Sequence, residues 1–238
     1  MSYDRALTRF SSDGRLFQIE YAAAAAHNGT TVLAIQAPGI IVAAIEKRDM
    51  MKLQKQDSSN NMCLLDKHIL CAFTGLPADA RVLVEKAQFE AQSYRLTFED
   101  AIPIENIARY IATVQLTYTQ SGGVRPFGVT TLICGFDPLD KPHIYETLPS
   151  GILSEWKARG IGRFGHPVQE YIEKYYVDNL SEDDVKRITI GSLREIADCR
   201  PKNMEVAIMK PNSPVVYMSP EEIAGIVKGI DKPDNVNL

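Results

Sequence analysis

The order of the expected elements predicts an α+β fold, a four-layer sandwich in which two antiparallel sheets stack face to face and helices cover each outer side. Strands occur in adjacent groups joined by short turns, whereas a parallel sheet would alternate strands with helices. Helices occur in pairs between these groups. No linker or change of composition divides the 238 residues. We therefore expect a single domain over residues 1–238, with an N-terminal segment and helix at 1–28 and a polar tail at 232–238.

The first half of the chain reads as one helix, four strands and two more helices. Residues 16–27 favour a helix because they contain five consecutive alanines, and Asn28-Gly29 predicts a left-handed cap at its end. Pro38-Gly39 separates apolar runs at 31–37 and 40–46, which predicts a hairpin. A second strand pair is expected at 62–65 and 69–73. Two helices with an apolar residue at i, i+3, i+4 and i+7 follow Pro77 and Pro103.

The second half returns to strands and ends in a helix. Strands are expected at 128–136, at 143–147 and near Ile152. A helix is expected at 167–176, and another begins at Ser181, where the acidic residues that follow suit the positive end of a helix. A last strand pair is expected at 204–210 and 215–218. Ser219-Pro220-Glu221-Glu222 is a capping box that predicts the final helix.

The composition excludes several classes of protein. The net charge is −4, and Lys and Arg are not clustered as a nucleic-acid surface requires. No apolar run reaches the length of a membrane span, and the N-terminus lacks the apolar region of a secretion signal, so we expect an intracellular, soluble chain. The four cysteines lie far apart in the sequence and lack metal-ligand spacing: Cys63, Cys71, Cys134 and Cys199. We therefore expect reduced, mostly buried thiols, and no metal or cofactor.

One glycine-rich motif could indicate a nucleotide site. Gly160, Gly162 and Gly165 match GxGxxG, which in a dinucleotide-binding oxidoreductase follows a buried parallel strand and opens a helix. Here a charged segment, SEWKAR, precedes the motif, and two helices separate it from the next strand. We therefore expect a loop that leads into a helix and no cofactor.

Thr30 raises the question of an N-terminal nucleophile. A threonine hydroxyl can use its own α-amino group as base if the preceding bond is cut. Cleavage between Gly29 and Thr30 would expose such a residue at the head of a strand. The helix at 16–27 would then be a discarded propeptide, although its sequence favours a well-formed part of the fold. The following hairpin offers Ile45, and not a carboxylate, on its second strand.

Two short segments, at 79–81 and 125–128, are interpreted as structural corners, where the chain enters a helix or passes from a helix to a strand. Asp79 and Arg81 lie in the first turn of the helix that follows Pro77, where an acidic residue suits the helix dipole. Four residues connect the end of the next helix to a strand: Arg125, Pro126, Phe127 and Gly128.

Several longer motifs identify a family. YDRALTRFSSDGRLFQIEYA at 3–22 is similar to the N-terminal signature of alpha-type subunits of the 20S proteasome. The likeness continues in GLPADARVL at 75–83, YTQSGGVRPFG at 118–128, GFD at 135–137, PSG at 149–151 and WKARGIGR at 156–163, and covers about residues 1–225. The resemblance implies the N-terminal nucleophile hydrolase fold. It also implies a component of a seven-membered alpha ring that acts in ubiquitin-dependent protein degradation in cytoplasm and nucleus.

The same resemblance implies that the chain has no catalytic residues. Catalytic beta subunits use a processed threonine with a lysine and an aspartate, whereas alpha subunits keep the N-terminal helix. In this sequence Thr30 takes the place of the nucleophile, Ile45 that of the aspartate and Asn61 that of the lysine. The implied partners are other alpha subunits, the beta ring and regulatory particles. An active threonine hydrolase cut before Thr30 is the alternative.

A gate cluster is implied at Tyr3, Asp4, Ser12 and Tyr21. Ser12 stands where the family has proline, which would fix φ and hold a reverse turn. We expect residues 12–14 to form the turn through their own propensity.

An activator pocket is implied at Glu20, Asn61, Gly75 and Leu76. Asn61 replaces a lysine that pairs with the terminal carboxylate of an activator. Because an amide cannot supply that ion pair, we expect weaker docking at this pocket.

Overall fold

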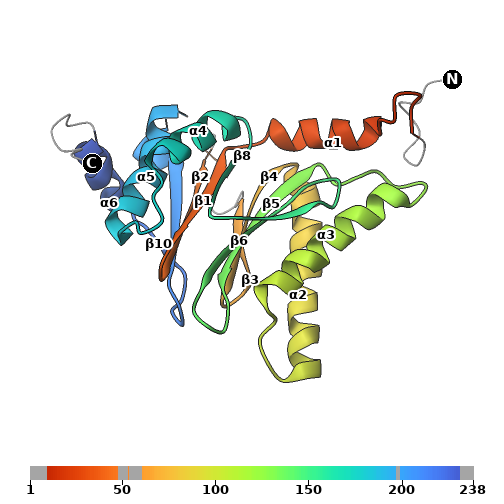
Figure 1. The fold of residues 1–238 in the computed structure, drawn as a ribbon, viewed down its shortest axis with the longest axis horizontal. Helices are drawn as coiled ribbons and strands as arrows, with labels where there is room; N and C mark the ends of the chain where they lie inside the picture. The colour runs from red at the N-terminus through yellow and green to blue at the C-terminus, as the bar shows by residue number, and fades with distance from the viewer. Residues whose placement is uncertain (1–9, 48–52, 54–60, 197–198, 231–238) are drawn as a thin grey trace.

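Two five-stranded antiparallel sheets form the centre of the molecule (Figure 1). The computed structural model describes residues 10–47, 53, 61–196 and 199–230. The first sheet contains, in spatial order, β10 (Val216–Tyr217), β9 (Met204–Met209), β2 (Ile40–Glu46), β1 (Val32–Ala37) and β8 (Ala158–Ile161). The second contains β3 (Met62–Asp66), β4 (Ile69–Gly75), β5 (Val129–Phe136), β6 (Pro142–Thr147) and β7 (Leu153–Trp156).

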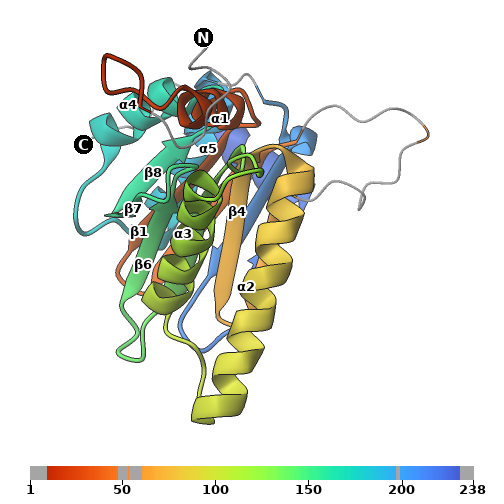
Figure 2. The ribbon, with the colours of Figure 1, turned by 90° about the vertical axis from the view of Figure 1, so that its right-hand side faces the viewer.

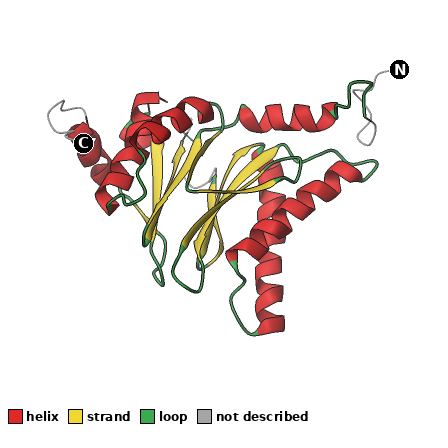
Figure 3. Cartoon of the chain, in the orientation of Figure 1, coloured by secondary structure: helices red, strands yellow, loops and turns green. Residues whose placement is uncertain are grey.

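Helices cover the outer face of each sheet, which confirms the predicted four-layer sandwich (Figure 3). Helices α2 (Pro77–Phe98) and α3 (Ile104–Gln120) lie over the second sheet (Figure 2). Helices α4 (Gly165–Tyr175), α5 (Glu182–Ile196) and α6 (Pro220–Ile230) lie beside the first. Helix α1 (Phe17–His27) belongs to neither layer, because it crosses the upper end of the sheets in Figure 1.

Alternating side chains of the strands build three apolar layers. In β1, Val32 and Ala34 belong to the core between the two sheets. Leu33 and Ile35 point to the opposite face and pack with α4, α5 and α6. A third apolar layer joins the second sheet to α2 and α3. Strands buried on both faces read as continuous apolar runs, which is why the sequence lacks the polar alternation of a surface sheet.

The hairpin predicted at Pro38-Gly39 is confirmed. Strands β1 and β2 pair antiparallel with Ala37 opposite Ile40, and Gly39 has φ +74°, in the region that glycine adopts without strain. The other predicted strands and helices are also present, with ends shifted by one or two residues.

The structure differs from the sequence prediction at two local features. Strand β8 lies inside the segment expected to be a loop, and it is defined by pairing with β1, where Val32 faces Ile161. Asn28 caps α1 with φ −78° and ψ 2°, so the predicted left-handed cap is wrong. The Asn28 N–H instead donates to the Ala24 carbonyl at 3.1 Å, and the Gly29 N–H donates to the Ala26 carbonyl at 3.1 Å. The predicted tail at 232–238 lies outside the described residues.

The capping box predicted at Ser219 is confirmed, and most cysteines are buried, as predicted. Ser219 and Glu222 form a reciprocal capping box at α6: the Glu222 N–H donates to Ser219 Oγ at 3.3 Å, and the Ser219 N–H donates to Glu222 Oε2 at 2.8 Å. Cys71, Cys134 and Cys199 are buried, and Cys63 is partly buried. Within the described part of the chain, no helix has both the length and the apolar character required to cross a membrane.

Candidate functional site

The junction between α1 and β1 is buried and held by two side chains. Thr30 is only 9% exposed. The side-chain amide of Asn61 donates to Thr30 Oγ1 at 2.7 Å, and the Thr74 hydroxyl donates to the Thr30 carbonyl at 2.7 Å. Asn61 is itself placed by β4, since its carbonyl accepts the Phe73 N–H at 3.0 Å. The described partners of Thr30 are therefore an amide and a hydroxyl, and neither is ionisable.

Glycines allow three chain segments to meet at this junction. A Cβ on Gly29 would lie 2.2 Å from the Gly75 nitrogen, and one on Gly162 would lie 2.2 Å from the Thr30 carbonyl oxygen. Gly75 and Gly162 also have φ of +112° and +92°. Any side chain at these positions would separate α1 from the ends of β4 and β8.

The alanines of α1 let the helix approach these strand ends. Ala26 is 1% exposed, and its Cα lies 3.1 Å from the point that a Cβ of Gly75 would occupy. The Thr74 hydroxyl also reaches the Ala26 carbonyl at 3.2 Å. Helix α1 is thus joined to the sandwich at its C-terminal end by small residues and backbone acceptors.

A carboxylate lies near the junction but on the neighbouring threonine. Glu46 Oε2 accepts the Thr31 hydroxyl at 2.8 Å, and Arg163 donates to Glu46 Oε1 at 2.6 Å. Successive residues of an extended chain point to opposite faces, so this carboxylate does not serve the Thr30 hydroxyl. Ile45, which is predicted to take the position of the aspartate, is 1% exposed in the core between the sheets.

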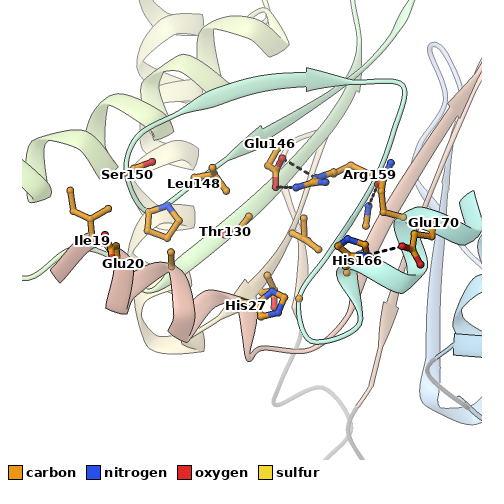
Figure 4. A pocket seen from close by; sticks show the side chains of 18 of the residues that line it. Ile19, Glu20, His27, Thr130, Glu146, Leu148, Ser150, Arg159, His166 and Glu170 are labelled. Carbon is orange, nitrogen blue, oxygen red and sulfur yellow. Dashed lines mark hydrogen bonds and ion pairs between the residues drawn. The ribbon is translucent and has the colours of Figure 1, made fainter. Parts of the chain in front are cut away.

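A cleft of about 760 Å³ lies beside α1 (Figure 4). Its walls come from α1, the loop between β6 and β7, strand β8 and the start of α4. A partly buried ion pair lies at one side, where Arg159 donates to both Glu146 oxygens at 3.0 and 3.2 Å. His166 and Glu170 form an exposed pair at 3.3 Å on α4. The described residues contain no group of three or more side chains suited to hold a metal ion.

The residues of the predicted activator pocket divide between two places. Asn61 and Gly75 lie at the α1–β1 junction. Leu76 is next to them and 43% exposed, with its N–H on the Gly128 carbonyl. Glu20 lies about two helical turns before the junction, where both of its oxygens accept from Arg15. This pair lowers the pKa of Glu20 below its ordinary value.

Half of the predicted gate cluster can be placed. The turn at 12–14 forms without proline, because the Gly14 N–H donates to the Ser11 carbonyl at 3.0 Å and Gly14 has φ +74°. Tyr21 is half exposed on α1 and stacks on Phe17. Tyr3 and Asp4 lie outside the described residues, so the cluster itself stays a prediction.

The two predicted corners meet through an ion pair. Both Arg125 amino groups contact the Asp79 carboxylate, at 2.5 and 2.7 Å, and the Gly128 N–H donates to the same carboxylate at 3.1 Å. The hydrogen bonds from Arg125 and Gly128 hold the pKa of Asp79 below its ordinary value. Phe127 is buried beside Tyr118, which anchors the segment to α3. Arg81 takes no part in this pair and lies 3.9 Å from Glu85 on the exposed side of α2.

The GxGxxG segment has the wrong geometry for a dinucleotide site. Gly160 lies inside β8, opposite Leu33, and β8 is antiparallel to β1. A dinucleotide fold needs a parallel strand whose end delivers the glycines to a phosphate. These glycines instead allow close packing, since a Cβ on Gly160 would meet Val168 at 2.8 Å.

Sequence reasoning missed Glu46, Arg163 and Thr74. The first two are far apart in sequence, and only the pairing of β1 with both β2 and β8 brings them together. A signal was present for Thr74, because a polar residue that interrupts an apolar strand next to glycine is typical of a backbone contact.

Comparison with known proteins gives a consistent result along the chain. A family model described as "Proteasome subunit" matches residues 26–209. A second model, which describes the N-terminal signature of A-type proteasome subunits, matches residues 3–25. Together they cover most of the described structure and the segment before it.

Curated relatives carry the same description. The alpha type-7 proteasome subunit of Dictyostelium discoideum is 45% identical over 96% of this chain and 91% of that protein. The alpha type-4 proteasome subunit of Saccharomyces cerevisiae is 45% identical over 97% of this chain and 92% of that protein. The alpha type-7-A proteasome subunit of Arabidopsis thaliana is 46% identical over 94% of this chain and 90% of that protein. The segments MSYDRALT and LFQIEYA also indicate the fourth alpha subunit of the eukaryotic ring, known as alpha type seven.

The glycine packing at the junction leads to a first prediction. Gly162→Ala should lower the free energy of unfolding by more than about 2 kcal/mol, because it adds a Cβ at positive φ against the Thr30 carbonyl. Gly225→Ala is the matched control: this glycine lies in α6 with open space around it, so the change should stabilise by about 0.5–1 kcal/mol. Urea unfolding measures both. Equal effects would contradict the proposed packing.

The Asp79–Arg125 pair leads to a prediction about pH. Because the pKa of Asp79 is lowered in the folded state, its stabilisation is present above the pKa of the unfolded chain and is lost as the pH falls through the folded value. Asp79→Asn should cost about 1–2 kcal/mol near neutral pH, a modest value because Arg125 is exposed. The difference from wild type should shrink below about pH 4 in unfolding measurements. Arg81→Ala should change stability by less than about 0.5 kcal/mol at any pH.

Proposed function

The chain belongs to the proteasome subunit family as a member of the alpha type, and on this premise we propose that it is a non-catalytic component of the alpha ring of the 20S core particle. In this proposal the active threonines belong to beta subunits. The chain supports ring assembly, pore gating and activator docking in ubiquitin-dependent protein degradation. It has no catalytic residue of its own.

The observation that carries the proposal is the environment of Thr30. An N-terminal threonine nucleophile needs a free α-amine and a nearby charged group that lowers its proton affinity. Here Asn61 supplies a neutral amide to the hydroxyl, and the nearby carboxylate of Glu46 contacts Thr31. The carbonyl of Gly29 accepts the Arg163 N–H at 3.1 Å, so residues before the would-be cleavage point are integrated into the fold.

The proposal also covers the partners of the chain and its location in the cell. The partners would be other alpha subunits in a seven-membered ring, the beta ring, and a regulatory particle or other activators. Residues 1–28 would contribute the gate, with Tyr3, Asp4, Ser12 and Tyr21 as its cluster. The complex would work in cytoplasm and nucleus. The high identity to named alpha subunits over nearly the whole chain supports this assignment.

The decisive experiment measures the intact mass of the chain in a purified core particle. A full-length chain is expected, and a chain that begins at Thr30 would establish the alternative of an active threonine hydrolase. Treatment with a peptide boronate or epoxide should modify beta subunits and leave Thr30 unmodified.

Replacement of Thr30 separates structure from catalysis. Thr30→Ala should leave peptidase activity of the assembled particle unchanged, because the hydroxyl takes part in no reaction. It should lower the free energy of unfolding of the chain by about 1 kcal/mol, because the Asn61 amide loses its acceptor. Thr30→Ser keeps the acceptor and should restore most of that stability. Loss of one class of peptidase activity in Thr30→Ala would contradict the proposal.

Replacement of Asn61 tests the activator pocket. Asn61→Lys would place an ammonium where the amide now lies, so binding of a peptide that ends in a free carboxylate should become about tenfold tighter, equivalent to about 1.4 kcal/mol. The same peptide with an amidated C-terminus is the control, and it should bind equally to the wild-type particle and to the Asn61→Lys particle. Fluorescence anisotropy with assembled particles measures the two affinities. An equal gain for both peptides would show that no carboxylate is recognised at this position.

A further inference from the structure

Two cysteines lie directly opposite each other on neighbouring strands. Cys63 on β3 is paired in register with Cys71 on β4, so both side chains point to the same face of the sheet. The Phe73 N–H donates to the Asn61 carbonyl two residues away, which indicates that Cys63 and Cys71 form the hydrogen-bonded kind of cross-strand pair. The Cα atoms of such pairs are about 5.5 Å apart, within the range that a disulfide can span.

The Cys63 thiol also contacts the backbone of Cys71, and the two cysteines differ in exposure. The Cys63 thiol donates to the Cys71 carbonyl at 3.7 Å. Both cysteines pack on the side of the sheet covered by α2, where Cys71 is 1% exposed and Cys63 is half-buried at the edge. Strand β3 is the edge strand of its sheet and Cys63 is only partly buried, so we expect a small oxidant to reach its sulfur.

The environment divides the two thiols into different chemical roles. The neighbouring Cys71 side chain lowers the pKa of the more exposed Cys63. The proximity of Cys63 and complete burial raise the pKa of Cys71 well above its ordinary value. Cys63 is therefore the nucleophile of the pair, and Cys71 is the thiol placed to resolve its oxidised form.

The geometry points to a redox modification site: Cys63 and Cys71 form a reversible disulfide when the protein meets a peroxide. The Cys63 thiolate attacks one oxygen of hydrogen peroxide, the O–O bond breaks, and hydroxide leaves, which gives a sulfenic acid. The Cys71 sulfur then attacks the sulfenic sulfur, the S–O bond breaks, and the hydroxide leaves as water with the Cys71 proton. In total, two thiols and one peroxide give one disulfide and two waters.

The disulfide would fix an edge strand to its neighbour. β3 begins next to Asn61, whose amide holds Thr30, so oxidation would restrain the part of the sheet that supports α1. Cβ atoms of a hydrogen-bonded cross-strand pair are about 5.5 Å apart, wider than the roughly 3.5–4.5 Å of a disulfide, so the strands must shift to form the bond and we expect excess thiol to reduce it readily. Formation of this bond does not depend on whether the chain is catalytic.

The sequence provides a direct test by peptide mapping. Trypsin cleaves after Lys67, between the two cysteines, so peptides 56–67 and 68–81 stay together only through a disulfide. The purified protein is treated with hydrogen peroxide, alkylated under native conditions and digested without reductant. We expect an intact mass lower by two hydrogens, the linked peptide pair, and its disappearance after treatment with a dithiol. Amide exchange of β3 should slow in the oxidised form.

Variants identify the cysteines that react. Cys63→Ser should abolish the linked pair and leave Cys71 reduced. Cys134→Ala is the matched control and should retain the link, because Cys134 is fully buried in the core between the sheets, where burial raises its pKa to about 12. The proposal is overturned if peroxide converts Cys63 to sulfinic acid while Cys71 stays a free thiol, or if neither cysteine is oxidised before the methionines.

Discussion

The close approach of three backbone segments at the start of β1 is the constraint on which the molecule depends. Gly29, Gly75 and Gly162 have no side chains that would hold these segments apart, and Thr74 supplies one hydroxyl to two carbonyls. As a result, the short segment 28–31 connects α1 to β1 in contact with the ends of β4 and β8. The same residues bury Thr30. The residue at the position of a possible nucleophile therefore connects α1 to the sheets and has a structural role.

Polar groups around this junction are satisfied by neighbours in the chain. Glu46 contacts both Thr31 and Arg163, and Asp79 accepts from Arg125 and from the Gly128 backbone. Such hydrogen bonds and ion pairs satisfy the oxygens of these buried carboxylates and define where their segments lie. A helix that crosses the end of the sandwich and stays attached is suited to present a surface to other subunits, whereas a cleaved chain would open that end.

Much of the architecture could be predicted because most elements have strong local signals. The hairpin at Pro38-Gly39, the capping box at Ser219 and the apolar stripe of α3 each follow from neighbouring residues. Strand β8 has no such signal, since its four residues become a strand only through pairing with β1. The cap of α1 also could not be foreseen, because its geometry depends on the route that the chain takes past Thr74 and Gly75.

The sequence by itself determined the fold class and the family, and it predicted that Thr30 lacks its usual helpers, because these depend on residue identity, local periodicity and motifs. Only the tertiary structure decided which groups meet. It placed Asn61 on Thr30, Glu46 on Thr31 and Cys63 opposite Cys71, because strand register and sheet packing join residues that are distant in the chain or, for the cysteines, fix which face they share. Register is set by the whole sheet, so no short stretch of sequence contains it.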